Sequence, residues 1–274
     1  MIRRDATNSR GEPVWILISQ VEHARVSAGL ARPWGAGGVQ PLDPRGALLA
    51  TIEHHDDGWA DWERRPEVDP THGRPYDFME MPLEQALSIW DRSISVARCE
   101  AGPLGGWLVA SHFAALLRRG RAAHPHPVAY VELSDAWLAR ADEHRAGWLA
   151  DWRQSNPARH TAELANRGLA QLQMFDALSL WLCFALRDAP KTVATPDGPE
   201  LLLTPVDTGA EQNQSVVDCG QQTITVAPWP FDVPVVELSA PGRLVAAEHY
   251  TGPAELAAVP SQVVRLSWVI KPAS

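Results

Sequence analysis

The sequence has little cysteine and no long apolar run, and each absence argues against a class of protein. Three cysteines occur in 274 residues, widely spaced at Cys99, Cys183 and Cys219, with no CxxC pair. This argues against a disulfide framework and against a cysteine-based zinc site, and it fits a reducing, cytoplasmic location. The apolar run at 14–18 is too short for a signal peptide or a membrane span, so we expect no membrane partner.

Basic residues are also scarce. The chain has 24 Lys and Arg against 33 Asp and Glu, a formal net charge of −9, and no basic stripe. We therefore expect no binding to a nucleic-acid backbone. Tyrosine and phenylalanine are few, at 3 and 5, whereas 12 tryptophans lie mostly in the first two thirds of the chain, where their helical spacing indicates core packing.

Hydrophobic periodicity divides the chain into two parts. Helical spacing continues to about residue 187, and short β-branched runs replace it beyond residue 188. The pattern predicts a mainly α fold with a small antiparallel β-rich C-terminal region, α+β overall. The expected domains are residues 14–188 and 189–274. Expected helices cover about 20–32, 44–57, 82–94, 104–119, 134–148 and 161–187, and expected strands cover 201–204, 223–227, 233–238, 244–247 and 263–270, with a further short strand at 14–18 and a loop at 60–81.

One polar stretch, residues 53–59, follows an apolar helical run and has the sequence Glu-His-His-Asp-Asp-Gly-Trp. His55 shares the core-facing stripe of its helix with Leu48 and Ile52, whereas His54 is turned about 100° away. Gly58 stands where a C′ glycine would end the helix. A buried charge must be paired, protonated or bound to a metal, so His55 and Asp56 require a partner.

Other inward-facing polar residues on separate helices supply further metal-competent groups. The expected metal ligands are His23, His55, Asp56, His112 and Asp176, with His144 as an extra candidate. Imidazole and carboxylate ligands without sulfur suit Mn, Fe, Co, Ni, Zn or Mg. The alternative is a buried hydrogen-bond network of satisfied core histidines and a salt-bridged aspartate.

In this order, these residues resemble the pattern of the HD-domain metal-dependent phosphohydrolases. His23, the pair His55-Asp56 and the distant Asp176 occupy the positions of the superfamily's ligands, and Gly58 follows the pair after one residue as in the pattern, over residues 19–187. The resemblance implies an HD-like helical bundle, a divalent metal ion and phosphohydrolase activity, with His112 as a further histidine of the kind found in two-metal members. The chain also resembles an uncharacterised bacterial family with a His-Asp-Asp-Gly-Trp signature. Asp57, Trp59 and the insertion at 60–81 depart from the phosphohydrolase pattern and put the substrate class in doubt.

The leading hypothesis is a metal-dependent hydrolase of a small phosphorylated compound, a phosphomonoester or a nucleotide. The expected catalytic residues are Asp57 and His54, which could orient a water or protonate the leaving oxygen. Candidate substrate-binding residues are Arg64, Arg65, Arg74, Trp59, Trp62 and Tyr76. The alternative for the three arginines is pairing with the acidic residues Glu63, Glu67, Asp69 and Asp77 around them.

Two other classes stay open. One is a catalytically silent ligand-binding or regulatory module on the HD-like scaffold, with a pocket walled by Trp59, Trp62 and Tyr76. The other is a di-iron oxygenase on the same scaffold. The sequence is also compatible with a homo-oligomer.

Overall fold

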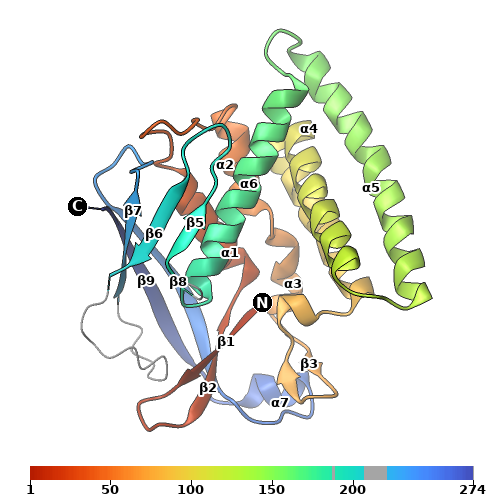
Figure 1. Ribbon diagram of the computed structural model, residues 1–274. Coiled ribbons are helices and arrows are strands. Elements are labelled where there is room, and N and C mark those ends of the chain that lie inside the picture. Colours follow the sequence, from red (N-terminus) through yellow and green to blue (C-terminus); the bar gives the residue numbers. More distant parts are fainter. Residues whose placement is uncertain (187–188, 207–220, 274) are drawn as a thin grey trace.

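The computed structural model describes residues 1–186, 189–206 and 221–273. Its sheet lies beside a group of helices, and the α4–α5 pair forms the side of the molecule away from the sheet (Figure 1). The helices are α1 (Gln20–Ala31), α2 (Arg45–His54), η1 (Asp57–Trp59), α3 (Ala60–Glu63), η2 (Phe78–Glu80), α4 (Leu83–Ala123), α5 (Val128–Ser155), α6 (Ala162–Cys183) and α7 (Pro253–Ala258). The strands are β1 (Ile2–Thr7), β2 (Pro13–Ile18), β3 (Val68–Asp69), β4 (Arg74–Pro75), β5 (Lys191–Val193), β6 (Leu201–Pro205), β7 (Gln221–Ala227), β8 (Val236–Ala246) and β9 (Gln262–Pro272).

The main sheet has seven strands in the order β1-β2-β8-β9-β7-β6-β5. Strands β7 and β9 are parallel, and the other neighbouring pairs are antiparallel. The N-terminal strand β2 pairs directly with β8, with Val14 opposite Ala246. Strands β3 and β4 form a separate two-stranded sheet.

The prediction of a mainly α fold with a small antiparallel C-terminal region is therefore wrong. The chain is α+β, but only 50% of it is helical, and the sheet is mixed and draws two strands from the N-terminus. The physical reason is that pairing between β2 and β8 joins segments more than 200 residues apart, which the hydrophobic pattern of either segment cannot reveal. The division into residues 14–188 and 189–274 stays a prediction, and its boundary lies outside the described residues, as do Arg187 and Cys219.

Several predicted elements are present with shifted limits. Helices α1 and α6 begin where expected, because Ser19 accepts a hydrogen bond from the Glu22 amide and Thr161 accepts one from the Leu164 amide. Helix α5 begins earlier than the expected residue 134, directly after Pro127, and Ser134 lies inside it, where its hydroxyl donates to the Tyr130 carbonyl. The expected strands 233–238 and 244–247 both overlap the single strand β8, which is continuous between them. The expected loop at 60–81 contains α3, η2 and the β3–β4 pair.

Helix α4 reverses direction at Gly102, whose φ of 66° is favourable only for glycine. Pro103 then begins the second half, a position that suits its fixed φ. The two halves, 83–101 and 103–123, lie against each other, because the rings of Trp90 and Phe113 stack at 4.9 Å. Helix α5 contacts both halves, because the Trp137 indole donates to Asp91 in the first half and Asp142 pairs with Arg118 in the second.

Helix α1 lies close to the sheet. A Cβ atom on Gly29 would be 2.5 Å from Cδ2 of Leu238 in β8, so the absence of a side chain allows the close approach. Trp34 joins the helical and β parts of the core, with its ring 5.1 Å from that of Phe175 and 5.7 Å from that of Phe231. No described helix is long and apolar enough to cross a membrane.

Candidate metal centre

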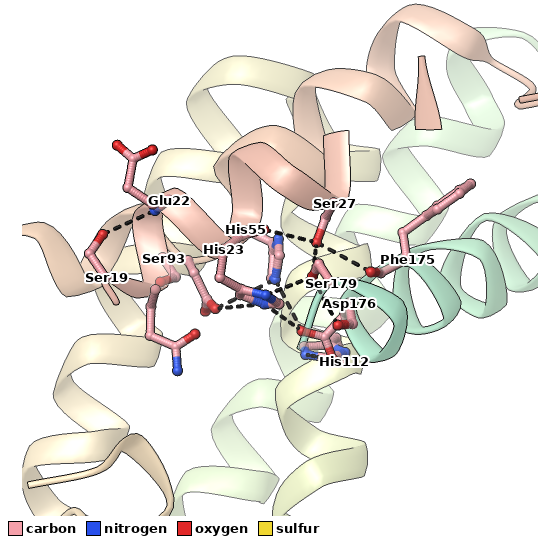
Figure 2. Close-up of polar contacts among 12 residues, drawn as sticks. Ser19, Glu22, His23, Ser27, His55, Ser93, His112, Phe175, Asp176 and Ser179 are labelled. Atoms are coloured by element: carbon pink, nitrogen blue, oxygen red, sulfur yellow. Dashed lines mark hydrogen bonds and ion pairs between the residues drawn. The ribbon is translucent and has the colours of Figure 1, made fainter. Parts of the chain in front are cut away.

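Four side chains from separate parts of the helical layer meet at one point. They are His23 of α1, His55 at the C-cap of α2, Asp56 directly before η1, and Asp176 of α6. One ligand atom from each lies within 4.8 Å of all the others, so the group could hold a metal ion. Figure 2 shows His23, His55 and Asp176 converging, with His112 beside them.

The distances within the group are short but not all are hydrogen bonds. Nε2 of His23 lies 3.0 Å from Oδ1 of Asp176 and 3.8 Å from Oδ2 of Asp56. Nε2 of His55 lies 3.4 Å from Asp176 and 3.5 Å from Asp56. The imidazole nitrogens and carboxylate oxygens therefore face a common centre.

His55 has the hydrogen-bonding state expected of a metal ligand. Its Nδ1–H donates to the Ile52 carbonyl at 2.8 Å, and in the neutral ring this leaves the lone pair on Nε2. Nε2 is fully buried and makes no hydrogen bond with the described residues. An unpartnered buried nitrogen facing two carboxylates fits a divalent cation, since first-row divalent metals and Mg accept imidazole and carboxylate ligands.

His23 is fixed by two serines behind it. The Ser179 hydroxyl lies 2.6 Å from Nδ1 of His23 and donates to the Asp176 carbonyl at 3.0 Å, and Ser27 lies 2.7 Å from the Ser179 hydroxyl. All three side chains are fully buried. Because a hydroxyl both donates and accepts, Ser179 can serve either tautomer of His23. A metal-ligating histidine usually has such a partner on its other nitrogen.

The turn that carries His55 and Asp56 is held against the first half of α4. A Cβ atom on Gly58 would lie 2.3 Å from the Ile89 carbonyl oxygen and 2.4 Å from the Ser93 amide nitrogen. The Gly58 amide also donates to the Ser93 hydroxyl at 3.1 Å. Gly58 does not have the positive φ of a C′ glycine, so that expectation is wrong. The glycine is required here because the two backbones are in close contact.

The charges of the group perturb one another strongly. Burial alone lowers the pKa of His55, but the carboxylates of Asp56 and Asp176 outweigh it and raise that pKa from 6.5 to about 9. Burial raises the pKa of Asp56. Burial acts in the same direction on Asp176, but contacts with His23 and His55 outweigh it and hold its pKa well below 3.8. Without a metal, the proton on His55 therefore supplies positive charge between the two carboxylates.

His112, on the second half of α4, lies at the edge of the group. Its Nε2 is 3.9 Å from Oδ2 of Asp176, and its ring centroid is 5.9 Å from that of His55. Its Nδ1 is buried and makes no hydrogen bond with the described residues. Burial lowers the pKa of His112 from 6.5 to about 4, so the ring is neutral at pH 7 and keeps a lone pair that can bind a metal ion.

The sequence matches a model of the family DUF3891, described as proteins of unknown function, over residues 1–247. The chain belongs to the DUF3891 family. All the residues of the metal centre lie inside the matched segment, whereas α7 and β9 lie outside it. No curated protein and no solved structure matches the chain.

The structure of this DUF3891 protein places the two expected catalytic residues beside the centre, in a separate polar contact. Asp57 forms an ion pair with Arg25 at 2.9 Å, and Nδ1 of His54 lies 2.6 Å from the Asp57 carboxylate. Arg25 also donates to the Glu53 carbonyl. These contacts tie the end of α2 to α1, which fixes the segment that carries His55 and Asp56.

The expected phosphate-binding arginines make local contacts. Arg64 pairs with Asp61, and Arg74 pairs with Glu80, whereas Arg65 is exposed and makes no ion pair with the described residues. Neither pairing involves the acids that the sequence had suggested. His144 is exposed and stacks on Trp148 at 5.3 Å, outside the metal-competent group.

The expected aromatic pocket is largely packed. Trp59 is buried, and its ring lies 5.8 Å from that of Trp62 in an edge-to-face contact. The Trp62 indole nitrogen is buried and makes no hydrogen bond with the described residues. Burial, with Asp69, Glu67 and Glu80 nearby, raises the pKa of Tyr76.

Sequence reasoning did not assign a role to Ser27 or Ser179. The signal was their spacing, because Ser27 lies four residues after His23 and Ser179 lies three residues after Asp176. Residues three or four apart share a helical face, so each serine follows a ligand on the same face.

Proposed function

We propose that this DUF3891 protein is a metal-dependent hydrolase of a small phosphorylated compound, such as a phosphomonoester or a nucleotide. The observation that carries the proposal is the buried, unpartnered Nε2 of His55, which faces the carboxylates of Asp56 and Asp176 at 3.5 and 3.4 Å. A purely structural network would be expected to satisfy that nitrogen with a hydrogen bond. The arrangement is better suited to a cation at its centre.

His23, His55, Asp56 and Asp176 would hold a Mn, Fe, Co, Ni, Zn or Mg ion. Two imidazoles and two carboxylates leave coordination positions free, and a bound ion would then lower the pKa of a water and polarise a phosphoryl oxygen. His112 is neutral at pH 7, because burial lowers its pKa to about 4, and its lone pair can add a further metal contact beside the centre. The proposal includes a relationship to the HD-domain phosphohydrolases, supported by the order of the four residues and their origin on separate helical elements.

Asp57 and His54 have a positioning role in this proposal. Their contacts with each other and with Arg25 hold the end of α2, from which His55 and Asp56 project. A direct catalytic role for either residue stays a prediction. The substrate-binding roles of Arg64, Arg65, Arg74, Trp59, Trp62 and Tyr76 also stay predictions.

The decisive experiment is elemental analysis of the purified protein and of Asp56→Asn, after reconstitution with each divalent ion in turn. We expect about one or two ions per wild-type chain and a loss of at least tenfold in metal affinity for the variant, because it removes an anionic ligand. Asp61→Asn is the matched control, since the Asp61 side chain is exposed, pairs with Arg64 and is not a member of the metal-competent group. Circular dichroism would check that both variants fold.

Hydrolysis is tested separately on the metal-loaded protein with a panel of phosphomonoesters and nucleotides. Release of inorganic phosphate that depends on Asp56 but not on Asp61 would support the proposal. A protein that binds no metal would disprove it altogether. Two iron atoms per chain and no hydrolysis of any compound would instead favour the oxygenase.

A further inference from the structure

A metal centre with two carboxylates attracts cations, so an anionic substrate needs positive charge nearby. The end of α4 carries three arginines, and two of them are tied to α5. Arg118 pairs with Asp142 at 2.9 Å, and Arg121 pairs with Asp135. Arg119 is exposed and makes no hydrogen bond or ion pair with the residues that the structure describes. Its guanidinium is therefore available for a ligand.

Helical geometry places Arg119 on the side of α4 that faces the metal centre. It follows His112 by seven residues, which is close to two turns, or about 10.5 Å along the axis. Side chains on a helix lean toward its N-terminus, so Arg119 extends back in the direction of His112. Ala115 and Leu116 lie between them on the same face, and Leu116 packs against the core rather than extending into solvent.

One further observation agrees with this position. The centre is open on its carboxylate side, because the Asp176 side chain is 13% exposed whereas those of His23 and His55 are fully buried. His112 lies 3.9 Å from that exposed carboxylate. A ligand that enters past Asp176 thus reaches His112 before the buried histidines.

We propose that Arg119 binds the phosphate group of the substrate at the mouth of the metal centre, and that it, rather than the arginines at 64, 65 and 74, selects for a phosphorylated compound. This inference rests on the proposed function. Arg119 can donate two parallel N–H bonds to phosphate oxygens, a geometry that lysine cannot reproduce. The class of ligand is a small phosphate monoester whose phosphate lies between the metal ligands and the second half of α4.

The test is calorimetric titration of the Mn²⁺-loaded protein with inorganic phosphate. We expect Arg119→Gln to weaken phosphate binding by about tenfold or more, because a charge-assisted, bidentate contact is lost. Arg119→Lys should recover only part of the affinity. Mn²⁺ affinity, measured separately, should be unchanged or slightly higher in Arg119→Gln, because Arg119 is not a ligand. The ³¹P line of phosphate should also be broadened less by bound Mn²⁺ in this variant.

Arg118→Gln is the matched control, since it removes the same charge from the adjacent residue, which is bound to α5. Phosphate affinity in Arg119→Gln equal to that of the wild type would overturn the inference and leave the proposed function standing. An equal loss of phosphate affinity in Arg118→Gln would also overturn the inference, because it would show that any positive charge at this end of α4 has the same effect. A chain that binds no divalent ion would fail the test of the proposed function itself, and this inference would fall with it.

Discussion

At the scale of single residues, the hydroxyl of Ser179 allows His23 to present Nε2 to a metal ion, because it can accept the proton of Nδ1. Asp176 can only accept hydrogen bonds while it is ionised, so in the metal-free state the 3.0 Å contact places a proton on Nε2 of His23. Binding a metal requires the lone pair of that nitrogen. The proton of a neutral ring must then be on Nδ1, where Ser179 can accept it at 2.6 Å.

Ser179→Ala should therefore weaken metal binding by about 10- to 100-fold, the usual effect of losing a partner behind a ligating histidine. Calorimetric titration with Mn²⁺ or Zn²⁺ measures the affinity, and ¹⁵N NMR of the His23 ring reports its tautomer. Ser95→Ala is a suitable control, because Ser95 is exposed and its hydroxyl bonds only to the Asp91 carbonyl. Unchanged affinity and an unchanged His23 tautomer in Ser179→Ala would contradict this role.

At the scale of secondary-structure elements, the contact between η1 and the first half of α4 positions two of the four ligands. Gly58 is at the contact point, and the atoms nearest to it belong to the backbone of Ile89 and Ser93, which cannot rotate away. The tight packing between these elements therefore fixes His55 and Asp56 relative to α4.

Gly58→Ala should destabilise the fold by about 1–3 kcal/mol, the usual cost of overpacking, and should reduce metal affinity as well. Urea denaturation gives the free energy of unfolding, and titration gives the affinity. Gly46→Ala provides a contrast, since no atom lies within 4 Å of a Cβ built there and alanine favours a helix by about 0.5–1 kcal/mol. Equal effects of the two substitutions would contradict the close-contact explanation.

At the scale of the whole molecule, the sequence predicted the helices and the metal-competent residues better than it predicted the sheet. Helix α1 and the inward direction of His23 follow from local signals, namely the Ser19 cap and the 3.6-residue period. The seven-stranded sheet depends on pairing between β2 and β8, and that information is distributed over distant segments. Likewise, the local pairing of Arg64 with Asp61 and the position of Arg119 become visible only in three dimensions.

Folding stability and metal binding are coupled through the same charges. Because the pKa of His55 is raised to about 9 in the folded chain, its contribution to the stability of the metal-free protein is fully present below pH 6.5 and is lost as the pH rises to 9. A metal ion must displace the proton from His55. Below pH 9, this competition should make the apparent affinity for the metal rise by about tenfold for each pH unit. Only the folded chain brings the ligands together, so bound metal stabilises the native state.

Metal should therefore raise the melting temperature by more at pH 8 than at pH 6, with roughly a 100-fold difference in affinity between the two. Thermal unfolding with and without saturating Mn²⁺ or Zn²⁺ measures the first effect, and titration in two buffers of different ionisation enthalpy counts the protons released. Asp56→Asn gives the reference, because it should lose most of the metal-dependent shift at both pH values. A shift that is the same at pH 6 and pH 8, with no proton release, would mean that the metal does not compete with the proton on His55.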